Sequence, residues 1–140
     1  RFGHFNGSIF RNGVSLGNIT SARVTYMNNL DKIETIRGDG RIDGADPSIA
    51  ACKGQIVSRF ADLTLYNQAT AQQACELEFR HTIGASEKFV FTAHAVYLPR
   101  PRTPIEGPGG VEATFDWQAA LDTSPPRMIT CVLTNAVASY

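Results

Sequence analysis

Apolar and polar residues alternate along most of this chain with a period of two, the pattern of half-buried β-strands. The clearest case covers residues 111–121, and residues 75–83 alternate in the same way. Residues 88–98 are apolar on both faces, which predicts a central strand, and residues 128–135 predict a last strand that closes the sheet. The side chains expected to face inward are Cys75, Leu77, Phe79, His81 and Ile83 in one strand and Val111, Ala113, Phe115, Trp117, Ala119 and Leu121 in the other.

The first half of the chain predicts further strands. Residues 7–17 read as a tight hairpin, because Asn12-Gly13 supplies the two residues that tolerate positive φ in a two-residue turn. Residues 19–26 and 52–60 follow as strands. Together these patterns predict about seven strands.

One segment has helical spacing instead. Residues 63–72 are predicted to form a short helix in which Leu65, Tyr66 and Ala69 share one face. Asp62 stands just before them and is a residue type that favours the N-cap position.

Between these elements, residues 27–50 fit neither the strand nor the helix pattern. The segment is polar and rich in Gly and Asp. Long structureless stretches are uncommon inside a compact domain, and those that occur are usually functional or disordered. We therefore expect residues 31–50 to form a long extended loop with a role of its own.

These elements predict an all-β protein with one short helix, an antiparallel β-sandwich or barrel that forms a single domain over residues 1–140. The chain has 13 basic and 13 acidic residues, so its net charge gives no sign of non-specific nucleic-acid binding. No apolar run approaches the roughly 18 residues of a membrane helix, and we expect no membrane span.

Three cysteines, Cys52, Cys75 and Cys131, form no paired spacing. Cys75 and Cys131 lie within predicted strands, where cysteine commonly acts as a small buried hydrophobic residue. We expect reduced structural thiols, and a disulfide or a reactive thiol is the alternative.

No catalytic set is visible in the sequence. Glu112 and Asp116 lie roughly 13 Å apart along one strand, too far for either glycosidase mechanism. Glu76 and Glu78 have a suitable spacing, but Arg80 shares their polar face. The histidines lack zinc-ligand spacing, and residues 38–44 match neither a phosphate loop nor a calcium loop. We expect no enzymatic activity, no cofactor and no metal.

Several segments together resemble the tail tube proteins of long-tailed bacteriophages. The sharpest are YMNNL at residues 26–30, FADLTLY at 60–66 and EGPGG at 106–110, and the likeness extends over residues 5–137. In that family the matched region is often preceded by another stretch, so this chain is expected to be the C-terminal part of a longer subunit.

The resemblance implies a structural virion protein that self-assembles into rings. Stacked rings form the tail tube, through which DNA passes without specific binding during genome ejection. The implied partners are further copies of the chain and neighbouring tail proteins, and the implied location is the virion tail, after assembly in the host cytoplasm.

Two sets of residues are expected to have roles in such an assembly. The loop at residues 31–50 lies where family members reach a neighbouring subunit. Its expected interface residues are Asp31, Ile33, Ile36, Arg37, Asp39, Arg41 and Ile42. An acidic wall would repel DNA phosphates and let the genome slide. The candidates for the lumen are Glu76, Glu78, Glu112 and Asp116.

Two alternatives remain at this stage. One is a β-sandwich module that binds carbohydrate or protein through a platform of Trp117 and tyrosines. Burial of Trp117 would count against it. The other is an enzyme on a β-barrel, which would need a deep pocket holding Glu76, Glu78 and a histidine.

Overall fold

The computed structural model describes residues 7–34, 38–39, 43–59, 63–100 and 112–137. Within them lie ten strands and one helix. In chain order the elements are β1 (Gly7–Arg11), β2 (Val14–Ser15), β3 (Ile19–Met27), β4 (Asp31–Ile33), β5 (Gly44–Asp46), β6 (Ala51–Arg59), α1 (Thr64–Ala71), β7 (Cys75–Ile83), β8 (Glu87–Tyr97), β9 (Glu112–Ala120) and β10 (Ile129–Thr134).

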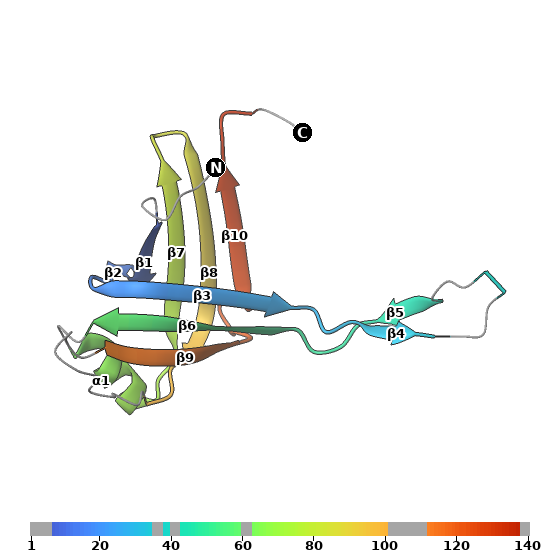
Figure 1. Ribbon diagram of the computed structural model, residues 1–140, viewed down its shortest axis with the longest axis horizontal. Coiled ribbons are helices and arrows are strands. Elements are labelled where there is room, and N and C mark those ends of the chain that lie inside the picture. The colour runs from blue at the N-terminus through green and yellow to red at the C-terminus, as the bar shows by residue number, and fades with distance from the viewer. Residues whose placement is uncertain (1–6, 35–37, 40–42, 60–62, 101–111, 138–140) are drawn as a thin grey trace.

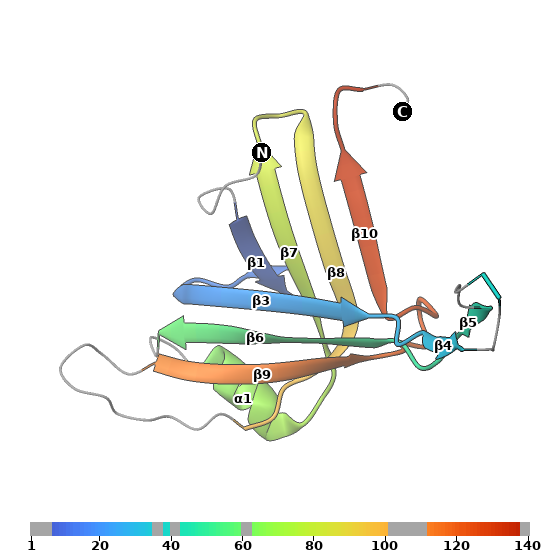
Figure 2. The same cartoon turned by 45° about the vertical axis from the view of Figure 1, so that its right-hand side comes forward.

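Eight strands form one sheet that bends into two layers. Its order is β2-β1-β7-β8-β9-β6-β3, and β10 pairs with β8 outside this path. The bend occurs along β8, where Lys88–Ala93 pair with β10 but Ala95–Tyr97 pair with β9. Figures 1 and 2 show the result, with β3, β6 and β9 running across β7, β8 and β10. All pairings are antiparallel, so the predicted all-β fold with antiparallel pairing is confirmed.

The core lies between the two layers. The fully buried side chains of Cys52 and Ile56 come from β6, and those of Leu77 and Val96 from β7 and β8. Alternation explains this placement, because every second residue of each strand faces the other layer. Burial of one such aliphatic side chain contributes about 1.5–3 kcal/mol.

The N-terminal hairpin has the predicted turn. Asn12 and Gly13 have φ values of 49° and 77°, so both residues of the two-residue loop lie in the left-handed region. The amide of Leu16 donates to the carbonyl of Ile9 at 2.8 Å, which holds the hairpin closed.

Helix α1 packs at one end of the sandwich (Figure 2). Leu65 and Ala69 are buried as predicted, but Tyr66 is 39% exposed, since it lies beyond the edge of the buried face. The N-cap is Leu63, which makes no capping hydrogen bond through its side chain. The predicted cap, Asp62, lies outside the described residues. Gln68 accepts a 2.5 Å hydrogen bond from Arg11 Nη1, which ties the helix to β1.

Three of the sequence predictions are wrong. Leu121 is 68% exposed, because β9 ends at Ala120 and the chain leaves the core there. Cys131 is also exposed, since the β3/β6/β9 layer does not cover β10. The predicted irregular loop contains β4 and β5, which pair as a separate ribbon in addition to the eight strands of the main sheet.

Candidate assembly surfaces

Two long strands leave one edge unpaired in the described part of the chain. The outer edge of β3 has no neighbour, because β3 pairs only with β6, and β10 pairs only with β8. On β10, Val132 and Leu133 are 49% and 56% exposed. Free edges expose backbone N–H and C=O groups that readily pair with another chain.

An apolar groove accompanies the free edge of β3. Its volume is about 550 Å³, and its walls come from β3 and from the inner face of β1, β7 and β8. Side chains that give it its apolar character are Ile9, Val24, Phe79, Phe89 and Phe91. The β7/β8 hairpin extends past β3 (Figure 1). The second layer therefore does not cover the inner face of this part of the hairpin, and the groove lies there.

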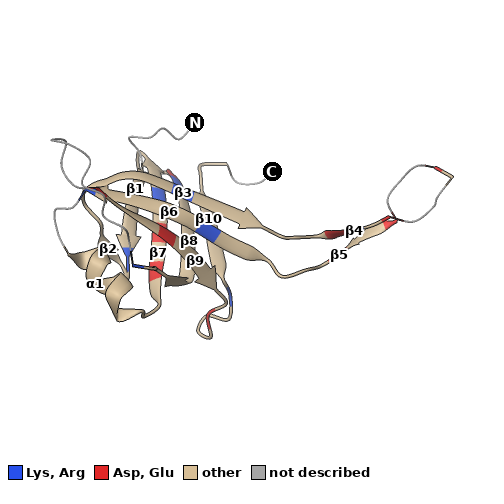
Figure 3. Ribbon diagram, turned by 60° about the horizontal axis from the view of Figure 1, so that its bottom comes forward, with Lys and Arg blue, Asp and Glu red and all other residues tan. Residues whose placement is uncertain are grey.

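The ribbon of β4 and β5 projects from the body (Figures 1 and 3). Its base is fastened by Asn29, whose Nδ2 donates to the carbonyl of Ile49 at 2.9 Å. Leu30 and Ile49, also at the base, are 57% and 85% exposed. An isolated two-stranded ribbon is at best marginally stable in water, so contacts with another molecule would favour its ordered form.

The structure places only part of the predicted interface set. Asp31 and Ile33 lie on β4, and Asp39 lies between the two strands. Ile36, Arg37, Arg41 and Ile42 lie outside the described residues. Ile33 is half-buried within the ribbon, and its Cδ1 packs over Gly44 on the opposite strand.

The four acidic residues expected to line the lumen lie on two different outer faces of the sandwich. Phe79 of β7 and Trp117 of β9 contact each other across the core. Glu76 and Glu78 are an odd number of residues from Phe79, as Glu112 and Asp116 are from Trp117, so both pairs point out of the sandwich. The two pairs therefore lie on opposite outer faces, and one surface of a subunit cannot carry all four.

On the outer face of β7, the carboxylates have cationic or polar partners. Glu78 forms an ion pair with Arg80, whose guanidinium lies 3.9 Å from the ring centroid of Phe10. Glu76 Oε2 lies 3.2 Å from His94 Nδ1, and His94 Nε2 lies 2.7 Å from Thr130 Oγ1. These contacts connect β7, β8 and β10 side by side.

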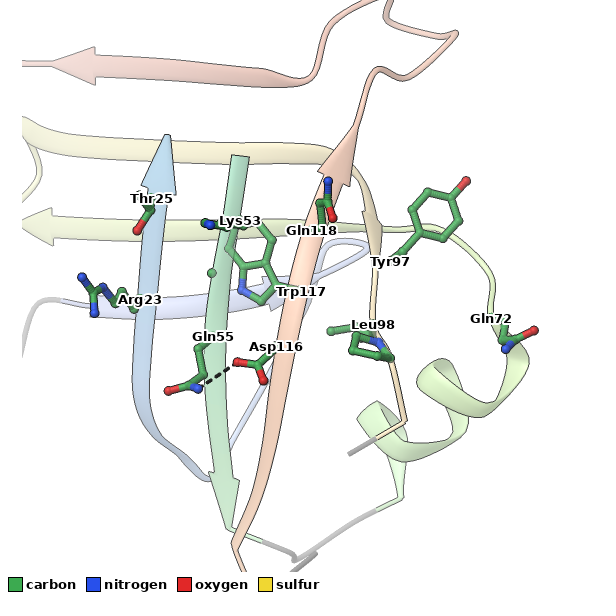
Figure 4. Close-up of a pocket in the computed structure, with 12 residues that line it drawn as sticks. Arg23, Thr25, Lys53, Gln55, Gln72, Tyr97, Leu98, Asp116, Trp117 and Gln118 are labelled. Carbon is green, nitrogen blue, oxygen red and sulfur yellow. Dashed lines mark hydrogen bonds between the residues drawn. The ribbon is translucent and has the colours of Figure 1, made fainter. Parts of the chain in front are cut away.

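On the outer face of β9, Asp116 belongs to a polar row. Gln55 Nε2 donates to Asp116 Oδ1 at 2.8 Å, and Gln55 is in turn the register partner of Arg23. The next row joins Thr25, Lys53 and Gln118. Together they line a shallow hollow of about 990 Å³ that is closed on one side by Tyr97 (Figure 4).

Neither Arg23 nor Lys53 was predicted from the sequence to belong to a functional site. Both stand at polar positions of their strands, but only the register places them as diagonal neighbours. Their charge alone does not indicate a site, because basic and acidic residues are interspersed over the body (Figure 3).

The described residues show neither the deep acidic pocket nor the aromatic platform that the two alternatives require. Neither the hollow over β9 nor the groove beside β3 is lined by Glu76 or Glu78. Trp117 is only 2% exposed, so it forms no binding platform. In the part of the chain that the structure describes, no cluster of His, Cys, Asp or Glu could hold a metal ion. No helix among these same residues has the length and apolar character needed to cross a membrane.

Solved structures share this fold at low sequence identity. The cap that terminates the tube of the anti-feeding prophage matches with a TM-score of 0.70 and 13% identity, over 96% of this chain and 92% of that one. The sheath/tube terminator of an extracellular contractile injection system, PVC, gives 0.72 and 7%, over 94% and 96%. The SPP1 tail tube gives 0.64 and 9%, over 98% and 81%.

At the level of sequence, no curated protein matches the chain. The family model described as "Phage tail tube protein" matches residues 1–119, most of the chain. The two-layer sandwich with free strand edges and a projecting ribbon agrees with that match, and the chain belongs to the phage tail tube protein family.

Proposed function

We propose that this chain is a tube subunit that assembles into rings, and that the rings stack into the conduit for genome delivery in a virion tail. The observation that carries the proposal is the family match together with the unpaired edges of β3 and β10. Each edge can pair with another copy, and a closed ring leaves no edge exposed. Cyclic symmetry limits the ring laterally, and head-to-tail stacking extends it along the axis.

The ribbon supplies a second contact in this proposal. It reaches beyond the body of its own subunit, so its interface partners belong to a neighbouring copy. Asp31 and Ile33 are the described members of this contact, with Asp39 nearer the tip. Neighbouring tail proteins would meet the same surfaces at the two ends of the tube.

The two acidic pairs lie on opposite outer faces, so only one pair can line the proposed lumen. On the β7 face, Glu76 and Glu78 stand with Arg80, and Glu78 already pairs with it. The β9 face carries two cations, Arg23 and Lys53, that form no ion pair with a described residue and would retain DNA phosphates. We therefore assign Glu76 and Glu78 to the channel wall and place Glu112 and Asp116 away from it.

The family's structural role fits a protein without enzymatic activity. Its site of action would be the virion tail, with assembly in the host cytoplasm and passage of DNA without specific binding.

Electron microscopy of the purified chain tests the proposal. Rings or tubes of uniform diameter are expected, and the fraction of protein assembled into them should rise with protein concentration. A protein that stays monomeric at all concentrations, by light scattering and by microscopy, would contradict it.

A further inference from the structure

The ribbon carries an arrangement of charge that is unfavourable in an isolated subunit. Asp31 and Asp46 are register partners on β4 and β5, so their side chains stand directly opposite each other. Both are exposed, and neither makes an ion pair with a described residue. Like charges opposite each other on a sheet are destabilising.

The segment that contains the ribbon has a net negative charge. Residues 31–50 contain five acidic and three basic residues, a net charge of −2, while the chain as a whole is neutral. Figure 3 shows acidic residues on the ribbon, away from the body. A cationic surface on another molecule would relieve this repulsion.

The hollow over β9 has the complementary charge. Arg23 and Lys53 stand on neighbouring strands in adjacent rows, since Arg23 pairs with Gln55 and Lys53 pairs with Thr25. Such diagonal neighbours lie roughly 7–8 Å apart. Neither cation forms an ion pair within the described residues. The one carboxylate in the lining, Asp116, accepts a hydrogen bond from Gln55.

The hollow also has a shape that could receive a ribbon. It is open and about 990 Å³ in volume, with Pro99 in its lining. Tyr97 borders it on one side (Figure 4). A ribbon lying there would place two carboxylates against two cations. The ribbon of the same subunit projects away from the body, so a second copy must supply it.

We propose that the β4–β5 ribbon of one subunit docks in the hollow over β9 of a second copy, with Asp31 and Asp46 facing Arg23 and Lys53. This inference rests on the proposed tube assembly, whose subunit contact it specifies. The contact is heterologous, because ribbon and hollow are different surfaces, and it is therefore able to propagate from copy to copy.

Charge reversal on either side tests the docking. One variant reverses the hollow with Arg23→Glu and Lys53→Glu, and the other reverses the ribbon with Asp31→Lys and Asp46→Lys. Each alone should raise the protein concentration needed for assembly by at least about tenfold, because like charges at an interface are strongly unfavourable. Lys88→Glu, on β8 in the other layer, is the matched control and should assemble like the unmodified chain.

Mixing the two reversed variants gives the decisive result. Each variant fails with copies of itself, but the ribbon of one complements the hollow of the other, so a 1:1 mixture should assemble. Restoration by mixing requires a contact between molecules. Circular dichroism and thermal unfolding check the fold of each variant. The neutral versions Lys53→Gln and Asp46→Asn, with smaller expected effects, replace any variant that fails to fold.

The outcomes separate this inference from the proposed function. If the unmodified chain forms tubes but both reversed variants also assemble normally, the docking is overturned and the tube proposal stands. Loss of assembly without restoration on mixing would likewise overturn the pairing of these two surfaces. If the unmodified chain itself forms no rings or tubes, both proposals fail together.

Discussion

The indole ring of Trp117 stacks on the ring of Phe79, with centroids 5.9 Å apart and planes 26° from parallel. Trp117 belongs to β9 and Phe79 to β7, so this contact joins the two layers of the sandwich. A second contact, between Phe79 and Phe91 at 6.2 Å, extends the aromatic cluster into β8. Aromatic pairs at such distances add about 0.5–1.5 kcal/mol to the effect of burial.

Loss of this contact should destabilise the whole fold. For Trp117→Ala we expect the free energy of unfolding to fall by about 3–5 kcal/mol, the range for large aromatic truncations in cores. Trp117→Phe keeps a ring at the site and should lose clearly less. Urea denaturation with far-ultraviolet circular dichroism measures both. Equal losses for the two variants would show that the stacked ring is not what joins the layers.

Gly54 occupies a position where no side chain fits. A Cβ at this residue would lie 2.0 Å from the carbonyl oxygen of Arg23 and 2.5 Å from Cζ2 of Trp117. The first of these atoms belongs to the backbone of β3 and cannot rotate away. Gly54→Ala should therefore destabilise the protein by more than about 1 kcal/mol, as measured by thermal unfolding. Gly17→Ala is the control, because a Cβ there meets nothing within 4 Å.

Alternation in the sequence was sufficient to predict the strands that build the body. Ala113, Phe115, Trp117 and Ala119 are all buried, as the period of two required. The prediction failed where the outcome depends on what covers a strand. Cys131 has a strand-like context, yet it is exposed because the opposite layer stops short of β10.

The assembly surfaces were harder to predict than the strands. β4 and β5 are three residues each, too short to show a period, and their pairing places Asp31 opposite Asp46. The opposite outer faces of Glu76 and Asp116 depend on how the sheet bends along β8. Local sequence carries no information about that bend.

The buried thiols should make stability depend on alkaline pH. Desolvation by burial raises the pKa of Cys75 to about 11, against an opposing effect of Arg11, and burial also raises the pKa of Cys52. The unfolded chain ionises its thiols near pH 9.0. The folded state therefore keeps its protons longer, and the free energy of unfolding should fall as pH rises from about 9 to about 11.

A comparison with Cys75→Ala separates this effect from the titration of lysines and tyrosines. The difference in stability between the two proteins should change over that pH window and stay constant below pH 8. Thiol reagents at pH 8 give an independent check, since Cys131 should react rapidly and the two buried cysteines only on unfolding. A constant difference across the whole range would contradict the assignment.

Reversal of the proposed channel charges should impair passage of DNA. Glu76→Lys with Glu78→Lys would turn the β7 face cationic, and DNA phosphates would be retained on it. We expect tubes of normal appearance but a lower efficiency of genome delivery in an infection assay. The same reversal at Glu112 and Asp116 is the matched comparison and should leave delivery unchanged in any tubes that form. If the second pair impairs delivery and the first does not, the β9 face lines the channel instead.

Removal of the ribbon should separate folding from assembly. Asp31 and Asp46 are register partners, so replacing residues 32–45 by Asn-Gly would close the two strands with a two-residue turn. The contacts between β3 and β6 begin at Met27 and Ala51, outside the replaced segment. We expect a variant with unchanged circular dichroism and a similar unfolding temperature that stays monomeric in sedimentation experiments. If it forms tubes as readily as the full chain, the ribbon contributes nothing essential to assembly. If it fails to fold, the ribbon stabilises its own subunit, contrary to its projection away from the body.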